Sequence, residues 1–272
     1  MDPTDLLLLL LSGCVGGFLA GMLGIGGGIV YVVIFSFYLE RLGIPGQLMV
    51  PAIVANSMLA ILFSSISGTL KHIRNKNFFP GDILSMGIPA ALLSVLGTHL
   101  IQMGSWYTKD RFTILFIIIL VYTVIRLFLQ KEASMPLKPE KNSMSLNILI
   151  GCLGGLLAAL SGLGGGIIMI PLMSNLLHFS LKKATTVSLG VIVVITLVHS
   201  VYSMATEAGD ALQIPWSLGL ICLPVVLPVS VGSIIFSPLG VMTAFRASAK
   251  TLRISFGILI LCVIAKMIHS LI

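Results

Sequence analysis

Long apolar stretches alternate with short polar clusters along the chain, and this pattern predicts membrane-spanning helices. Several stretches exceed the roughly 18 apolar residues that one membrane-spanning helix needs. In the first half they cover Asp5–Leu39, Gln47–Leu70, Ile83–Met103 and Phe112–Gln130. In the second half they cover Leu146–Leu177, Ala184–Ala205, Trp216–Phe236 and Leu252–Ile272. The sequence therefore predicts an all-α polytopic membrane protein.

Glycines interrupt the first apolar stretch of each half. The segments Leu23–Ile29 and Ser161–Ile167 each hold four glycines inside an apolar run. Glycine is the poorest ordinary helix former after proline, so we expect the helix to break at both places. A break at membrane depth has to be buried in protein or line a cavity, because lipid cannot bond its backbone amides.

The two broken segments are copies of one another. A shift of 138 positions lays Cys14–Ile34 on Cys152–Leu172, and ten of the 21 residue pairs are then identical. A proline and a glycine recur at a spacing of 135, as Pro89 and Pro224 and as Gly97 and Gly232. We therefore expect a first membrane repeat at 1–130, a cytoplasmic linker at 131–145 and a second membrane repeat at 146–272, each repeat holding one broken hairpin and three transmembrane helices.

Each broken segment is predicted to enter and leave on one side of the membrane. As one helix, the 35 residues Asp5–Leu39 would measure about 52 Å, against a hydrocarbon core of ~30 Å. If each broken segment is a hairpin, twelve of the 16 Lys and Arg residues lie on one side of the membrane and four on the other. If each broken segment crosses the membrane once, eight lie on each side. The positive-inside rule favours the uneven split. It predicts a cell (inner) membrane protein with both termini outside the cytoplasm and two inverted repeats, as in many secondary transporters.

Composition excludes several other classes of protein. Hydrophobic residues make up 57% and charged residues 9% of the 272 positions, against about 25% charged in soluble domains, so no room is left for a soluble catalytic domain. The basic residues that give the net charge of +7 fall in short loops, so no nucleic-acid partner is expected. The four cysteines form no Cys-x-x-Cys pair, and no metal site or cofactor is predicted. We expect no enzyme activity, because no nucleophile–base pair is visible.

A new helix is expected to begin after each glycine break, at Ile29 and at Ile167. The first amides of a helix lack an acceptor and carry the positive end of its macrodipole, so two such ends suit an anion. Nearby hydroxyl and amide side chains would add donors, and the alternative is that the glycines only permit tight helix packing. The candidate substrate-binding residues are Gly26, Gly27, Gly28, Asn56, Ser57, Ser161, Gly164, Gly165, Gly166 and Ser188.

Substitution of the glycines is expected to separate binding from folding. A β-branched side chain would forbid positive φ and block the close approach of a ligand. We therefore expect Gly27→Val or Gly165→Val to abolish anion binding while the protein stays folded. No Asp or Glu lies near the middle of any span, so a carboxylate proton relay is not expected.

The paired glycine motifs resemble those of the TauE/SafE family, also called the TSUP family. The second copy has the family's proline at Pro171, whereas Val33 stands at that place in the first copy. The stretches Ala55–Met58 and Thr186–Leu189 resemble the family's G-T-S-L motifs without the glycine. The resemblance covers nearly the whole chain and implies a membrane permease, usually an exporter, for sulfur-containing anions such as sulfite, sulfoacetate or related organosulfonates.

Together these features predict a transporter of a small sulfur-containing anion. The anion would bind near mid-membrane between the two hairpin tips, and rocking of one repeat against the other would alternate access. An anion channel with the same site, and a transporter of another sulfur compound such as thiosulfate or sulfate, are the alternatives. The expected partners are the anion and the lipid bilayer, and a homo-oligomer is compatible with the sequence.

Overall fold

The computed structural model describes residues 2–104, 106–129, 139–141, 143–206, 215–246, 257, 260–265 and 267. Its elements are α1 (Pro3–Leu23), α2 (Gly28–Arg41), α3 (Gly46–Arg74), α4 (Pro80–Met103), α5 (Lys109–Leu129), α6 (Met144–Ser161), α7 (Gly166–Leu176), α8 (Leu181–Ala205), β1 (Ser217–Leu218), β2 (Ile221–Cys222) and α9 (Leu223–Arg246). Within these residues, six helices are long and apolar enough to cross a membrane: α1, α3, α4, α6, α8 and α9. The predicted helical, multi-pass architecture is confirmed. Most of the predicted linker 131–145 and of the segment Leu252–Ile272 lies outside the described residues.

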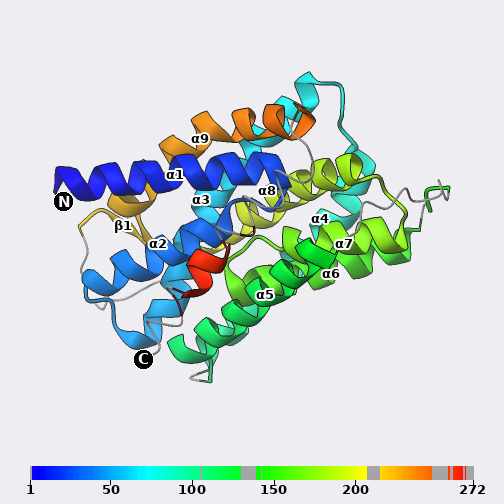
Figure 1. Ribbon diagram of the computed structural model, residues 1–272. Helices are drawn as coiled ribbons and strands as arrows, with labels where there is room; N and C mark the ends of the chain where they lie inside the picture. Colours follow the sequence, from blue (N-terminus) through cyan, green and yellow to red (C-terminus); the bar gives the residue numbers. More distant parts are fainter. Residues whose placement is uncertain are drawn as a thin grey trace.

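Each glycine-broken segment is a hairpin whose two helices return to the same end of the molecule (Figure 1). In the first hairpin, Arg41 near the end of α2 pairs with Asp5 near the start of α1 at 3.2 Å, and the Tyr38 hydroxyl donates to the same carboxylate at 3.0 Å. In the second, the Lys141 amide before α6 donates to the Leu177 carbonyl after α7 at 3.0 Å. Both predicted hairpins are therefore confirmed.

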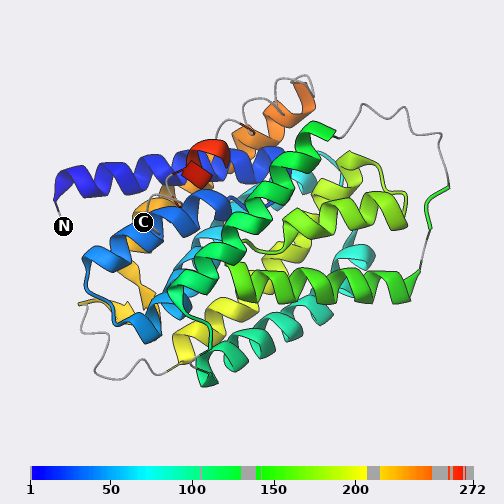
Figure 2. The ribbon, with the colours of Figure 1, turned by 60° about the horizontal axis from the view of Figure 1, so that its bottom comes forward.

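The first helix of each hairpin packs against a helix from the other half of the chain. Helix α1 lies along α9, and α6 lies along α4; Figures 1 and 2 both show α1 and α9 side by side. A Cβ atom added at Gly13 would collide with the backbone of Val229, and one added at Gly151 with the backbone of Met86. Small residues thus let the helix backbones approach closely, as is usual between membrane helices.

The predicted segment Trp216–Phe236 starts too early. Its first residues form the antiparallel β1–β2 hairpin, in which Ser217 pairs with Cys222, and α9 then runs from Leu223 to Arg246. Apolar residues continue through strand and helix alike, so hydropathy does not mark the boundary between them. Helices α4 and α9 both have 24 residues, and their starts lie 143 positions apart (223 minus 80). The repeat spacing of 135 is therefore wrong for this helix by eight residues, about two helical turns.

Charged side chains gather at the two ends of the bundle. One end, which we call the Asp5 end, carries the Asp5–Arg41 pair and an ion pair of 2.6 Å between Lys109 and Glu40. Arg41, Lys109 and Arg111, three of the four basic residues predicted to share one membrane side, lie here at the end of α2 and the start of α5. Those of the predicted twelve that the structure describes, such as Arg74 and Lys183, lie at the opposite end. The membrane side that each end faces stays a prediction.

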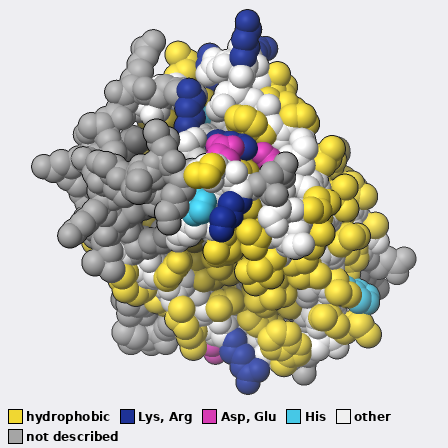
Figure 3. Space-filling view, turned by 90° about the vertical axis from the view of Figure 1, so that its right-hand side faces the viewer, with side chains coloured by type: hydrophobic (Ala, Val, Ile, Leu, Met, Phe, Trp, Pro, Cys, Tyr) yellow, Lys and Arg dark blue, Asp and Glu magenta, His cyan; other side chains and the backbone are white. Residues whose placement is uncertain are grey.

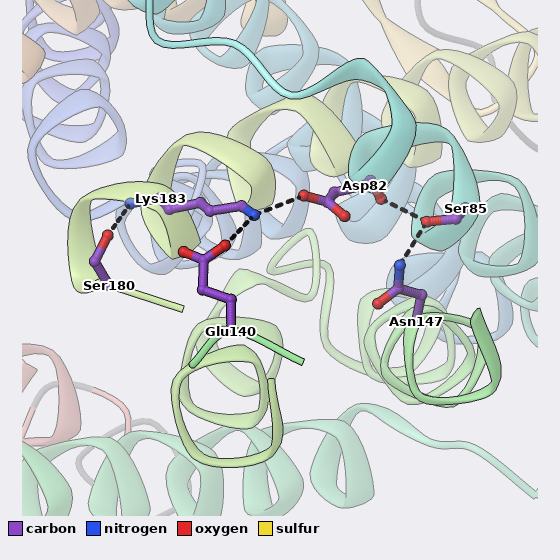
Figure 4. A network of polar contacts seen from close by, with 6 residues as sticks. All are labelled: Asp82, Ser85, Glu140, Asn147, Ser180 and Lys183. Atoms are coloured by element: carbon purple, nitrogen blue, oxygen red, sulfur yellow. Dashed lines mark hydrogen bonds and ion pairs between the residues drawn. The ribbon is translucent and has the colours of Figure 1, made fainter. Parts of the chain in front are cut away.

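The opposite end, the Lys183 end, is held by a lysine between two carboxylates. Lys183 in the first turn of α8 pairs with Asp82 in the first turn of α4 at 3.1 Å and with Glu140 before α6 at 2.9 Å (Figure 4). Its ammonium also lies 3.8 Å from the ring centre of Phe179 and 4.9 Å from that of Phe79. Figure 3 looks onto this side and shows acidic side chains beside basic ones, with hydrophobic side chains around them. The contact ties the first half of the chain to the second.

Candidate functional site

Two glycine loops with one shared backbone conformation join the helices of the hairpins. We call them the first glycine loop (Gly24–Gly28) and the second glycine loop (Gly162–Gly166). Their φ angles are 72°, 89° and 77° at Gly24, Gly26 and Gly27, and 69°, 75° and 80° at Gly162, Gly164 and Gly165. Residues with a Cβ atom rarely adopt this left-handed region, so glycine is required at these positions. Helices α2 and α7 begin at Gly28 and Gly166, one residue before the predicted starts.

The two glycine loops touch each other. A Cβ atom added at Gly28 would lie 2.8 Å from the Cα atom of Leu163, and one added at Gly166 would lie 2.8 Å from the carbonyl oxygen of Gly24. These contacts join a residue of each loop to the backbone of the other. The glycines therefore have two roles: they adopt the positive φ angles of the loops, and they permit the tight packing that the sequence suggested as an alternative.

The glycine loops lie halfway along the two long central helices. A Cβ atom added at Gly26 or at Gly164 would contact Ile61 of α3 and Ile192 of α8 at distances between 2.8 and 3.5 Å. Both isoleucines are near the midpoints of their helices. Because α3 and α8 are candidate membrane spans, the loops lie at the depth expected for the middle of the membrane.

The proposed valine substitutions would disturb the fold. A Cβ atom at Gly27 would collide with the carbonyl group of Gly16, and one at Gly165 with the carbonyl group of Gly154. Both glycines also have positive φ, which a β-branched residue cannot adopt without strain. The prediction that such variants stay folded is therefore wrong, and the site has to be tested with other residues.

Two serines hold the glycine loops in a reciprocal way. Ser57 of α3 donates to the Gly162 carbonyl at 3.1 Å, and Ser188 of α8 donates to the Gly24 carbonyl at 2.8 Å. Both side chains are fully buried. The two serines lie 131 positions apart, and each comes from the half opposite to the loop that it binds. The structure therefore brings these predicted site residues to the loops, at corresponding places.

Ser161 lies at the second glycine loop but bonds within its own hairpin. Its hydroxyl donates to the Leu157 carbonyl at 2.7 Å and accepts from the Leu163 amide at 3.3 Å. The side chain is 1% exposed. Ser161 thus stabilises the end of α6 and the start of the loop, and it orients the loop amides.

Asn56 bonds to the β1–β2 segment and to its own helix, with no hydrogen bond to a glycine loop among the described residues. Its amide group donates to the carbonyl groups of Ala52 at 2.8 Å and Leu220 at 3.0 Å, and its oxygen accepts from the Cys222 amide at 2.9 Å. These bonds fasten the β1–β2 hairpin to α3 and use both amide hydrogens of the side chain. Val187 stands at the corresponding position of α8, so this contact belongs to one half alone.

The starts of α2 and α7 offer backbone donors beside the loops. The Gly27 carbonyl accepts from Val30, and the Gly165 carbonyl accepts from Ile168, which closes the first turn of each helix. Within the described part of the chain, no group accepts a hydrogen bond from the amides of Gly28 and Ile29, or from the equivalent amides of Gly166 and Ile167. Four donors and two positive helix ends therefore meet at the loops, an arrangement that favours an anion over a cation.

Two further polar residues join the first glycine loop. Ser64 of α3 donates to the Gly26 carbonyl at 3.1 Å. The buried Tyr31, in the first turn of α2, packs against the loop: a Cβ atom added at Gly27 would lie 3.1 Å from its ring. Ser64 follows Ser57 by two helical turns, a spacing that puts both on one face of α3 and could have indicated it. Comparison of the two repeats misses it, because Ile195 stands at the corresponding position of α8.

The tip of the second hairpin is also held from the Asp5 end. The Tyr107 hydroxyl, in the connection between α4 and α5, donates to the Leu160 carbonyl at 2.6 Å. Burial raises the pKa of Tyr107 above its ordinary value, so the phenol keeps its proton and stays a donor. Among the described residues, no group of three or more His, Cys, Asp or Glu side chains could hold a metal ion.

Known proteins match this chain along almost its entire length. A family model described as sulfite exporter TauE/SafE matches residues 9–267. A probable membrane transporter protein of Methanocaldococcus jannaschii is 27% identical over 249 residues, which cover 91% of this chain and 89% of that protein. A probable membrane transporter protein of Haemophilus influenzae is 27% identical over 272 residues, which cover 97% and 98%.

A probable membrane transporter protein of Bacillus subtilis is 23% identical over 280 residues, which cover 97% of both chains. No solved structure matches the chain. The family model covers both glycine loops, five of the six candidate membrane spans in full, and α1 from residue 9 onward. This chain therefore belongs to the TauE/SafE sulfite exporter family of membrane transporters.

Proposed function

We propose that this transporter carries a small sulfur-containing anion, such as sulfite or an organosulfonate, out of the cell, and that it binds the anion at the two glycine loops. The observation that supports the site most directly is the set of four backbone amides without an acceptor at the starts of α2 and α7. The family match supports the class of substrate. Pyramidal and tetrahedral oxyanions need several donors, and backbone amides and hydroxyls provide them without a fixed charge.

The two helix starts make the site electrostatically suitable for a single anion. Each contributes roughly half a positive charge, and a favourable, partly buried helix end stabilises a negative charge by up to ~2 kcal/mol. The site has no lysine or arginine among the predicted residues, so the bound anion is held by dipoles alone. Such binding is weaker than an ion pair, and a carrier has to release its substrate in every cycle.

Alternating access follows in this proposal from two repeats of inverted orientation. The reciprocal bonds of Ser57 and Ser188 and the crossed packing of α1 on α9 and α6 on α4 support the pairing of the two halves. Rocking of one half against the other would part the glycine loops, admit the anion and open the site to each side in turn. The close contact of the loops favours a carrier over an open channel.

Flux in proteoliposomes tests the proposal. We expect purified transporter to accelerate sulfite or sulfoacetate flux, with a rate that saturates and with counterflow when anion is present on both sides. Thiosulfate, sulfate and taurine serve as competing substrates in the same assay. Flux that rises linearly with concentration and lacks counterflow would indicate a channel, and the absence of flux for every sulfur anion would refute the proposed substrate class.

A further inference from the structure

Polar side chains run along one face of α3, from the glycine loops to the Lys183 end. Ile61 packs against both glycine loops. Ser65, Thr69 and His72 follow it at intervals of three and four residues, which is the spacing of one helix face. All three are buried, with at most 9% of their surface exposed. We call them the first polar track.

The first polar track ends in a cluster of polar groups at the Lys183 end. The Nδ1 atom of His72 lies 3.0 Å from the Thr186 hydroxyl, which also accepts a hydrogen bond of 2.7 Å from the Asn77 side chain. Asn77 belongs to the connection between α3 and α4, at the surface of the bundle. The track therefore leads from mid-membrane depth to one aqueous end.

Helix α8 repeats the arrangement in the opposite direction. Ile192 packs against both glycine loops, as Ile61 does. Thr196, Ser200 and Ser203 follow it at the same spacing, and they are buried with at most 2% exposed. We call them the second polar track. Because α8 begins at the Lys183 end, this track leads away from that end, and the Ser203 carbonyl accepts from Leu220 of the β1–β2 connection.

The two tracks correspond residue by residue. Their members are 131 positions apart, the offset that also relates Ser57 to Ser188 and Ile61 to Ile192, and the pairs are Ser65 with Thr196, Thr69 with Ser200, and His72 with Ser203. These three pairs place polar side chains at corresponding positions on one face of each helix. Several of these track residues form no hydrogen bond to another helix among the described residues.

Three hydroxyl groups of the tracks lack a hydrogen-bond partner within the described part of the chain: those of Ser65, Thr69 and Ser200. Serine and threonine in a helix ordinarily bond back to a carbonyl of the preceding turn, as Thr196 does to Ile192 at 2.7 Å. A buried hydroxyl without a partner loses the hydrogen bonds that it would make in water, which destabilises the folded protein. Water or an anion that enters between the helices would supply the partner that these groups lack among the described residues.

We propose that the two tracks are the two halves of the translocation pathway, and that their hydroxyls pass a hydrated anion between the glycine loops and opposite ends of the molecule. This rests on the proposed function, because the glycine loops would be the point where the halves meet. No Asp or Glu belongs to either track, and hydroxyl donors suit an anion that moves from site to site. One half of the pathway leads to the Lys183 end along α3, and the other leads to the Asp5 end along α8.

Reaction of single cysteines with a charged thiol reagent tests the pathway. The background is a chain whose four native cysteines are replaced by alanine and which melts like wild type. Ser65→Cys, Thr69→Cys, Ser200→Cys and Ser203→Cys are then exposed to 2-sulfonatoethyl methanethiosulfonate. The matched controls Ile66→Cys, Leu70→Cys and Val201→Cys lie at the same heights, and their native side chains are 37%, 50% and 60% exposed on the outer surface of the bundle.

We expect the four track cysteines to react at least tenfold faster than the controls, because a thiol that faces lipid stays protonated and does not meet a charged reagent. Reagent on one side of a vesicle should reach positions 65 and 69, and reagent on the other side should reach 200 and 203. Track cysteines that react no faster than the controls, or both tracks reacting from the same side, would overturn the proposal.

Sulfoacetate separates this inference from the proposed function. If the anion uses the pathway, a saturating concentration should slow the reaction at positions 65 and 200 several-fold, and uncharged sucrose should not. Reaction of both tracks from opposite sides with no effect of any sulfur anion would keep the pathway and refute the proposed substrate class.

Discussion

The variant Ser188→Ala would test whether hydrogen bonds from one half of the chain hold the glycine loop of the other half. The Ser188 hydroxyl donates to the Gly24 carbonyl at 2.8 Å, whereas the Ser57 hydroxyl divides its one proton between Val54 at 2.9 Å and Gly162 at 3.1 Å. Ser188→Ala leaves a buried loop carbonyl without a donor, which costs about 1–3 kcal/mol. Ser57→Ala removes a shared bond, which is worth about 0.5–1.5 kcal/mol.

Thermal unfolding in detergent micelles measures the difference. For a chain of this size, each kcal/mol shifts Tm by roughly 2–4 °C, so Ser188→Ala should melt several degrees below wild type and Ser57→Ala less far below. The control is Ser12→Ala, whose hydroxyl donates to the Leu9 carbonyl within the same helix at 2.7 Å. Its Tm should stay near that of wild type.

The double variant adds a second check. Because the two glycine loops touch, the effects of Ser57→Ala and Ser188→Ala should differ from additivity by at least 0.5 kcal/mol, as is usual for residues that share partners. Anion affinity, measured by calorimetry, should fall in the same order as stability, since the loops orient the binding amides. If Ser188→Ala melts like Ser12→Ala, the reciprocal hydrogen bonds do not hold the loops and this reasoning fails.

Three other predictions concern the ends of the bundle. Lys183→Met should lower the free energy of unfolding by about 2 kcal/mol, because it removes the charged hydrogen bonds of Lys183 to Asp82 and Glu140. The exposed control Lys76→Met should have no effect, and equal melting of the two variants would contradict a stabilising role of Lys183. Tyr107→Phe should cost about 1–2 kcal/mol. Since the pKa of Tyr107 is raised on folding, its contribution is intact below pH ~10 and falls as pH rises above that value, so the variant should lose less stability in alkaline melting experiments. A cysteine at Lys109 should be labelled by an impermeant maleimide on whole cells and one at Lys141 should not, and the reverse result would contradict the predicted orientation.

The centre of the molecule was largely predictable because it is duplicated. The positive φ angles of the six loop glycines follow from a motif that occurs twice, and a glycine-rich break inside an apolar run has few structural explanations. Ser57 and Ser188 could be selected because they occupy corresponding positions of two apolar helices. Each of these inferences compares corresponding positions in the two halves of the chain.

Features that belong to one half were not predictable in this way. Ser64 contacts the first glycine loop, but its counterpart is an isoleucine. Asn56 looked like a site residue from its neighbour Ser57, yet its partners lie 164 and 166 positions later, in the β1–β2 segment. The start of α9 was missed for a different reason: apolar residues continue through β2 into the helix, so hydropathy does not mark where the helix begins.

The crossed packing of the hairpins has a consequence for how the chain is made. Helix α1 leaves the ribosome well before α9. Its glycine face, with Gly13, Gly17 and Gly21, fits the backbone of α9, whose first residue is synthesised about 200 residues later. At 5–20 residues per second, this face waits on the order of 10–40 s for its partner. Helix α6 has no such delay, because α4 precedes it. The first half therefore completes its packing only after α9 is inserted, and the two halves produced as separate chains should accumulate only when both are made in the same cell.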